Sequence, residues 1–178
     1  LTLATSSKTV VVSGSAVLSG KISSGRSNES VVVFSQRYAS GSFTAVATVL
    51  TDAGGVWTLR VRPRIATTYK AVWSGYSSPT VAIGVHPAVS LRALRRLRFA
   101  THVTGVRSFR GRIVQLQRRR LDGSWATVAR ARLNASSNAV FHPRLARGRS
   151  TLRVALSINQ AGGGYLAGFS RAISVRRS

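Results

Sequence analysis

Apolar and polar residues alternate along most of this chain with a period of two, which is typical of half-buried β-strands. Val, Ile, Thr and aromatic residues form runs that are separated, every ten residues or so, by clusters of Gly, Ser, Asn and Asp. The first half is predicted to hold seven strands, at residues 8–12, 15–23, 30–38, 43–51, 56–62, 67–73 and 79–85. The second half is predicted to hold seven more, at residues 88–92, 95–104, 111–120, 125–133, 139–145, 149–157 and 168–177. Helix signals are nearly absent, so the pattern predicts an all-β fold.

The two halves repeat one another at a distance of about 82 residues. Three pairs of segments align: 42–48 with 124–130, 31–36 with 113–117 at the same offset, and, with one residue of drift, 69–73 with 152–156. A period of this length is that of a whole small domain, not of a solenoid repeat. We therefore predict two domains, 1–86 and 87–178, with the boundary at Val85-His86-Pro87, where Pro87 favours an extended residue before it.

Seven strands in each half indicate two tandem immunoglobulin-like β-sandwich domains. The chain has no Cys, so the disulfide of antibody domains is missing and no thiolate can act as a metal ligand or nucleophile. We predict instead that Trp57 and Trp125 anchor the two cores.

The first domain carries a family resemblance. Its pattern is Phe43-x-x-Val46-Ala47-x-x-x-x-Thr51-Asp52-Ala53-Gly54-Gly55-x-Trp57, followed by Arg62-Pro63 and Tyr69-x-Ala71. It resembles the Ig-like repeats of secreted and surface proteins of GC-rich Gram-positive bacteria. The second domain shows the resemblance more weakly, because residues 134–138 replace the Thr-Asp-Ala-Gly-Gly turn. The resemblance implies an extracellular structural or adhesive role and transfers no catalytic residue.

Residues 91–98 allow two interpretations. Leu91, Leu94 and Leu97 are spaced three apart among arginines, as in a short basic amphipathic helix. A strand would instead place Leu97 and the alternate residues after it inward and Arg96 and Arg98 outward. We favour the strand, because it aligns with residues 16–22 of the first domain.

Positive charge is concentrated in the second domain. Of a net charge of +24, residues 1–86 carry +6 and residues 87–178 carry +18, with nineteen Arg, no Lys and one acid. Such a potential attracts polyanions, and guanidinium groups bind phosphate and carboxylate bidentately. The strand alternation makes six arginines candidates for a polyanion-binding surface: Arg96, Arg98, Arg130, Arg132, Arg149 and Arg153. The alternative is a solvated face in a chain whose codon bias favours Arg.

The sequence offers no constellation for catalysis or for metal binding. Its three acids, Glu29, Asp52 and Asp122, fall in separate predicted turns, so no two converge on one bond. The three histidines lack ligand spacing and a neighbouring acid. The run 162–168 contains three consecutive glycines but lacks the Gly-Lys-Ser/Thr ending of a phosphate-binding loop. We therefore expect neither an enzyme nor a cofactor.

The remaining expectations concern assembly and location. With no Met to start it, the chain is expected to follow a removed secretory signal and to be extracellular or at a cell surface. The first hypothesis is a self-assembling subunit of a filament, pilus or sheath, in which residues 1–12 add a strand to a neighbour, or alternatively form the first strand of their own sheet. Candidate subunit contacts are Leu1, Leu3, Val10, Val12 and Tyr165. Tyr165 lies in a loop that either packs on a neighbouring subunit or is a flexible loop without such a contact.

The second hypothesis is a surface module that binds an anionic polymer, such as a wall polymer, acidic polysaccharide or DNA, through the second domain. No motif for sequence-specific reading of nucleic acid and no apolar run of membrane-spanning length is present. Two sequons, at Asn28 and Asn134, are possible glycan attachment sites in predicted loops.

Overall fold

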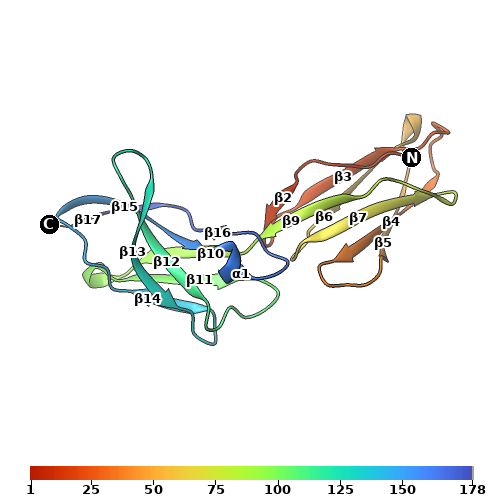
Figure 1. Ribbon diagram of the computed structural model, residues 1–178. Helices are drawn as coiled ribbons and strands as arrows, with labels where there is room; N and C mark the ends of the chain where they lie inside the picture. Colours follow the sequence, from red (N-terminus) through yellow and green to blue (C-terminus); the bar gives the residue numbers. More distant parts are fainter. Residues whose placement is uncertain (178) are drawn as a thin grey trace. The chain divides into compact units, whose positions relative to one another are not determined.

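The computed structural model describes residues 1–177 and divides the chain into two compact units, Leu1–Val85 and His86–Ser178 (Figure 1). Each unit consists of two antiparallel sheets that enclose an apolar core. Within residues 1–177 no helix is long and apolar enough to cross a membrane.

The first unit pairs a sheet of three strands with a sheet of six. The small sheet has the order β1-β3-β6, made of Ala4–Thr5, Ala16–Lys21 and Val56–Val61. The large sheet has the order β2 (Thr9–Val11), β9 (Val81–His86), β7 (Thr67–Trp73), β4 (Ser30–Arg37) and β5 (Thr44–Leu50). A short sixth strand, β8 (Tyr76–Ser77), also pairs with β7. The N-terminal segment thus starts on one sheet and crosses to the other.

The core of the first unit forms between the inward side chains of both sheets. Leu18, Val31, Val33, Trp57 and Ala71 are fully buried. As predicted, Trp57 is the central anchor, and its indole lies against Gly20 of β3. A Cβ built on Gly20 would lie 2.7 Å from two indole carbons, so only glycine lets β3 and the ring approach this closely.

The second unit repeats this plan. Its small sheet has the order β10-β11-β14, made of Ala88–Ala93, Phe99–Thr104 and Asn138–Phe141. Its large sheet has the order β13 (Trp125–Arg132), β12 (Ile113–Arg119), β15 (Gly148–Leu156) and β16 (Gly168–Phe169). A fifth strand, β17 (Ile173–Arg177), also pairs with β15. Fully or almost fully buried side chains fill the space between the sheets: Phe99, Phe109, Val114, Leu116, Phe141, Leu152, Val154 and Leu156.

Four details of the second unit differ from the sequence predictions. Arg95–Leu97 is neither strand nor amphipathic helix but a short 3₁₀ turn, with Arg96 and Leu97 at φ 57° and 54°, and β11 begins only at Phe99. The predicted last strand is split into β16 and β17. A four-residue helix, α1 (Ile158–Ala161), precedes the glycine run and has no counterpart among the predicted elements. The prediction of Trp125 as a core anchor is wrong, because Trp125 is only half-buried, on the outer face of the large sheet.

The repeat is real, but its register along one strand shifts by one residue. The inward pair Val31 and Val33 of β4 corresponds to Val114 and Leu116 of β12, an offset of 83 and not 82. The strand that follows keeps the offset of 82, because the β12–β13 hairpin is one residue shorter than the β4–β5 hairpin. Both hairpins contain a register shift at the same place, after Val33 in one unit and after Leu116 in the other. Because side chains alternate with period two, an alignment that is one residue off exchanges the two faces of a strand.

Candidate anion-binding surface

Six arginines of the second unit project from the outer face of its large sheet. Residues that alternate with the buried ones on each strand point away from the core. On β12, β13, β15 and β17 these outward positions include Arg119, Arg130, Arg132, Arg149, Arg153 and Arg176. We call this set the arginine face. Four of its members belong to the six candidates expected from the sequence, and no Asp or Glu occupies any of these four strands.

The strand register sets the spacing of the arginine face. Arg149 of β15 is the direct partner of Arg176 of β17, so two like charges face each other across neighbouring strands. Directly opposed like charges destabilise a sheet unless a counter-charge lies between them. On the other edge, Arg130 and Arg132 of β13 lie opposite uncharged residues of β12. The face therefore carries excess positive charge that an anion would neutralise.

Arg153 lies near the middle of the arginine face and is held between two aromatic rings. Its guanidinium carbon is 4.2 Å from the centroid of the Trp125 ring and 4.5 Å from that of Phe169. Its Nε donates a hydrogen bond of 2.9 Å to Oε1 of Gln117. Burial lowers the pKa of the Arg153 guanidinium below its ordinary value, but arginine starts so high that the group stays charged at neutral pH. Arg153 is thus a fixed cation.

The first unit has a cation at the corresponding position. Lys70 of β7 lies with its ammonium 4.8 Å from the Phe43 ring centroid and 5.6 Å from that of Phe34. Its partner on β4 is Phe34, just as Arg153 pairs with Gln117 on β12. The repeated Phe43 and Trp125 are therefore not core residues but the aromatic partners of a cation on the outer face of the large sheet.

We expect Arg153→Ala to destabilise the second unit by roughly 1–2 kcal/mol, because it removes two cation–π contacts and one hydrogen bond. Denaturant unfolding followed by tryptophan fluorescence measures this change, and Trp125 is the tryptophan of the second unit. Arg130→Ala removes the same charge from the same face without such contacts, so it should alter stability by less than about 0.5 kcal/mol. Equal effects of the two substitutions would contradict the stacked arrangement of Arg153.

Two adjoining hollows lie at the end of the arginine face where the β12–β13 hairpin turns. One is lined by residues 118–122 and Arg149, and the other by Gly148, Arg149, Ser174, Val175 and Arg176. Arg149 belongs to both hollows, which together are lined by five arginines: Arg118, Arg119, Arg120, Arg149 and Arg176. Planar guanidinium groups gathered around a concave surface can grip a phosphate, sulfate or carboxylate from several sides.

Asp122 is the only acid of the second domain and lies beside these arginines. Hydrogen bonds from Ser124, including its backbone N–H at 2.8 Å from Oδ1, lower the pKa of the Asp122 carboxyl below its ordinary value. Asp122 is fully exposed and forms the tight turn between β12 and β13. Its role is in the turn, as expected from the sequence, and one carboxylate leaves the hollows strongly positive.

The other two candidate arginines lie elsewhere. Arg96 and Arg98 belong to the 3₁₀ turn between β10 and β11, which are strands of the small sheet. They are exposed but do not share a face with the other four candidates. The sequence did not identify Arg119, Arg176 or the aromatic Phe169 as members of this surface. Their position beside the other arginines depends on which strands pair with β12 and β15. The alternation within β12 was the available signal for Arg119.

The candidate subunit contacts lie largely inside the first and second units. Val10, Val12 and Tyr165 are buried, with exposures of 8%, 5% and 4%. Leu1 and Leu3 are half-buried, and their segment pairs with the chain's own β3: the N–H of Thr2 donates to the carbonyl of Lys21. Residues 1–6 are therefore the first strand of their own sheet, which was the alternative to donation.

The loop that contains Tyr165 is packed and not a free contact loop. The Tyr165 hydroxyl accepts a hydrogen bond of 2.7 Å from the N–H of Val106, and the ring lies 5.7 Å from that of Phe109. The guanidinium of Arg107 donates to the carbonyls of Ala161 and Gly163, which fixes the glycine run.

The acids of the first unit have structural roles. Glu29 accepts hydrogen bonds from the Ser24 hydroxyl and, at 2.6 Å, from the indole N–H of Trp73. Asp52 precedes a short 3₁₀ turn. Within the described part of the chain, no three His, Asp or Glu side chains gather where they could hold a metal ion.

The histidines and the two sequon asparagines lie apart from the arginine face. Nδ1 of His86 is 2.6 Å from the carbonyl of Ala167, and Nδ1 of His102 is 2.9 Å from Oδ1 of Asn138. Asn28 is exposed, with a φ of 61°. The carbonyl oxygen of the Asn134 side chain accepts two backbone hydrogen bonds within its own turn.

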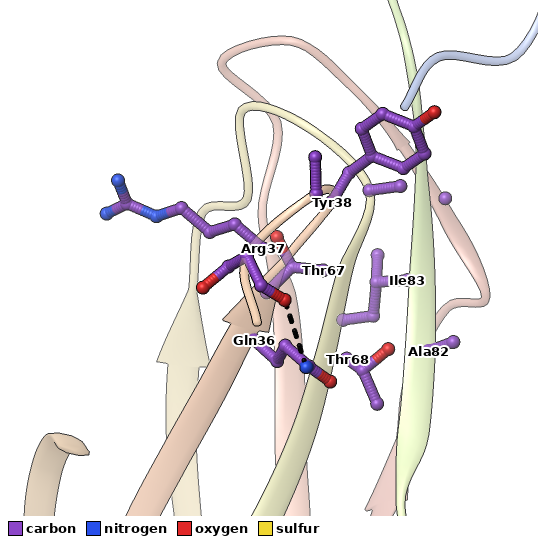
Figure 2. A pocket seen from close by; sticks show the side chains of 11 residues that line it. Gln36, Arg37, Tyr38, Thr67, Thr68, Ala82 and Ile83 are labelled. Carbon is purple, nitrogen blue, oxygen red and sulfur yellow. Dashed lines mark hydrogen bonds between the residues drawn. The ribbon is translucent and has the colours of Figure 1, made fainter. Parts of the chain in front are cut away.

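A separate hollow lies in the first unit, near the end of the β4–β5 hairpin (Figure 2). The Nε2 of Gln36 donates a hydrogen bond of 3.0 Å to the carbonyl of Ser40 across it. The Tyr38 ring and the guanidinium of Arg37 extend in opposite directions (Figure 2). With one arginine and no acid in its lining, this hollow offers less for a charged ligand than those of the second unit.

Comparison with known proteins supports the fold. No family model and no curated protein matches the chain. Among solved structures, the chicken interferon gamma receptor alpha chain aligns at 11% identity with a TM-score of 0.50, over 98% of this chain and 95% of that one. A segment of two fibronectin type III domains from chicken tenascin aligns at 12% identity with a TM-score of 0.50, over 98% and 97%. At this identity the likeness concerns the fold alone, and it confirms two tandem immunoglobulin-like β-sandwiches.

Proposed function

We propose that this chain is a non-enzymatic, extracellular tandem β-sandwich module that binds an anionic polymer through the arginine face of its second unit. The observation that carries the proposal is the gathering of six arginines on one face of one sheet, with five arginines around the adjoining hollows. Concentrated positive charge of this kind attracts long polyanions and releases their counter-ions.

The chemistry of the arginine face favours recognition of charge over recognition of sequence. Guanidinium groups match the planar geometry of phosphate, sulfate and carboxylate groups. Base reading requires an element that enters a groove, and the α-helix of the described residues is only four residues long. The ligand class is therefore a polymer with regularly repeated anionic groups: an acidic polysaccharide, a wall polymer or nucleic acid bound without regard to sequence.

The test is binding to heparin, a sulfated polysaccharide, by a variant with three arginines of the face replaced. We expect Arg130→Ser/Arg132→Ser/Arg149→Ser to lower the affinity at least tenfold, because about three anion contacts are lost. Surface plasmon resonance or isothermal titration calorimetry measures the affinity, and circular dichroism checks the fold.

The matched control is Arg92→Ser/Arg95→Ser/Arg98→Ser, which removes the same charge from exposed positions of the small sheet and its turn. This variant should lose much less affinity than the other. Equal losses would show that net charge alone sets binding, and unchanged binding by the first variant would refute the proposal.

Self-assembly into a filament is a second proposal. Assembly would not use strand donation by the N-terminal segment, because that segment pairs with β3 of its own chain. The feature that favours self-association is an open sheet edge in the first unit: β5 ends the order of its sheet and exposes Val46 and Leu50 by 48% and 59%. Negative-stain electron microscopy of the purified chain tests for filaments directly.

A further inference from the structure

We infer that strand β5 of the first unit is a self-association edge, at which the β5 strands of two copies of this chain pair antiparallel and join their large sheets. This inference is independent of polymer binding by the second unit. It rests on the sheet order, on the exposure of β5, and on a comparison of the two repeats.

The edge strand β5 is open along its length. In the part of the chain that the structure describes, the sheet order gives β5 one neighbour, β4. An edge strand has a row of main-chain N–H and C=O groups without partners in its own sheet, and a second strand can pair with them. Proteins usually protect such edges with charges, prolines or bulges.

Strand β5 lacks the charges and prolines that protect most edges. Residues 38–51 contain no charged residue and no Pro, in a chain with a net charge of +24. Val46 and Leu50 are 48% and 59% exposed, and Val56 at the start of the next strand is 40% exposed. The bulge lies at Val46, so the register from Ala47 to Leu50 is regular. An antiparallel strand can therefore pair with the outer edge of these four residues.

The second unit shows what a protected edge looks like at the same place. Strand β13 also ends its sheet, pairs on the same side and contains the same bulge. The register makes Thr48 equivalent to Arg130 and Leu50 equivalent to Arg132. Two arginines on a second copy's edge would repel those of the first. The same edge is therefore charged in one unit and uncharged in the other.

A second copy of this chain is the occupant that fits best. An uncharged edge has no electrostatic preference for a charged partner, and an identical strand presents an edge that is self-complementary about a two-fold axis. The first domain also carries only +6 of the net charge, so two copies repel one another least there. The contact is short, and we expect a weak dimer that forms as concentration rises.

Sedimentation equilibrium of the intact chain tests the inference. The apparent mass should rise from 19.0 kDa toward twice that value with concentration, and it should rise further in 0.5 M salt, where the repulsion between basic copies is screened. Polymer binding should weaken under the same change of salt. The two proposals can thus fail separately, since each has its own readout and the opposite salt dependence.

The decisive variant transfers the protection of β13 to β5. Thr48→Arg/Leu50→Arg should weaken the dimer at least tenfold. The control Ser23→Arg/Ser27→Arg adds the same charge in an exposed loop of the same unit and should leave most of the dimer intact. A chain that stays at 19.0 kDa at every concentration and salt, or equal behaviour of the two variants, would overturn the inference.

Cross-linking gives a readout that does not depend on those arginines. The chain has no Cys, so a disulfide in a single-cysteine variant can form only between copies. Under mild oxidation Thr48→Cys should form a disulfide dimer at least ten times faster than Ser27→Cys, whose position is also exposed. Equal rates would count against pairing at β5.

Discussion

We expect the affinity of the intact chain for double-stranded DNA to fall roughly 1000-fold when salt rises from 50 to 200 mM. DNA serves here as a polyanion of known charge spacing. Each phosphate that a cation neutralises contributes a slope of about −0.9 to the plot of log affinity against log salt. If the six arginines of the arginine face each contact one phosphate, the slope is close to −5.

Fluorescence anisotropy with a labelled duplex measures this slope. The variant Arg130→Ser/Arg132→Ser/Arg149→Ser should retain about half of it, which corresponds to a fall of roughly 40-fold over the same salt range. Two duplexes of equal length and unrelated sequence should bind equally well. A slope that is the same in the variant, or a strong preference for one duplex, would place the contacts outside the arginine face.

We expect Gly20→Ala to destabilise the first unit by roughly 3 kcal/mol. A Cβ at this position would lie 2.1 Å from the carbonyl oxygen of Thr2 and 2.7 Å from two atoms of the Trp57 ring. The backbone of the N-terminal segment and a fully buried indole cannot both give way, so either the pairing of residues 1–6 or the core packing is lost. Urea unfolding followed by tryptophan fluorescence measures the change.

Gly41→Ala is the matched control for Gly20→Ala. A Cβ on Gly41 meets no atom within 4 Å, and the residue lies outside the left-handed region. The change should leave stability within about 0.5 kcal/mol of the original. Similar stabilities of the two variants would contradict the close approach of β3, Thr2 and Trp57.

The fold was largely accessible from the sequence because the alternation of apolar and polar residues is local. Leu18, Val31 and Leu152 are buried where the period of two places them, and the turns fall at the clusters of small and polar residues. The segment that departs from the predicted strands does so because of its local backbone conformation. The 3₁₀ turn at Arg95–Leu97 requires two residues with positive φ, a conformation that neither Arg nor Leu indicates in advance.

The site was accessible only in part. Alternation identified Arg130, Arg132, Arg149 and Arg153 as outward. It did not reveal that these four share a sheet while Arg96 and Arg98 lie at a 3₁₀ turn, nor that Trp125 stacks on Arg153 instead of filling the core. Those relations depend on strand pairs that are distant in the sequence.

The sequence by itself determined the all-β class, the two repeats, the approximate strands and the excess of charge in the second half. The tertiary structure decided which charges lie together, that residues 1–6 belong to their own sheet, that Tyr165 is buried and that one edge strand is charged while its equivalent is not. The physical reason is that alternation is set by neighbouring residues. A face and an edge are set by the order and register in which distant strands form hydrogen bonds.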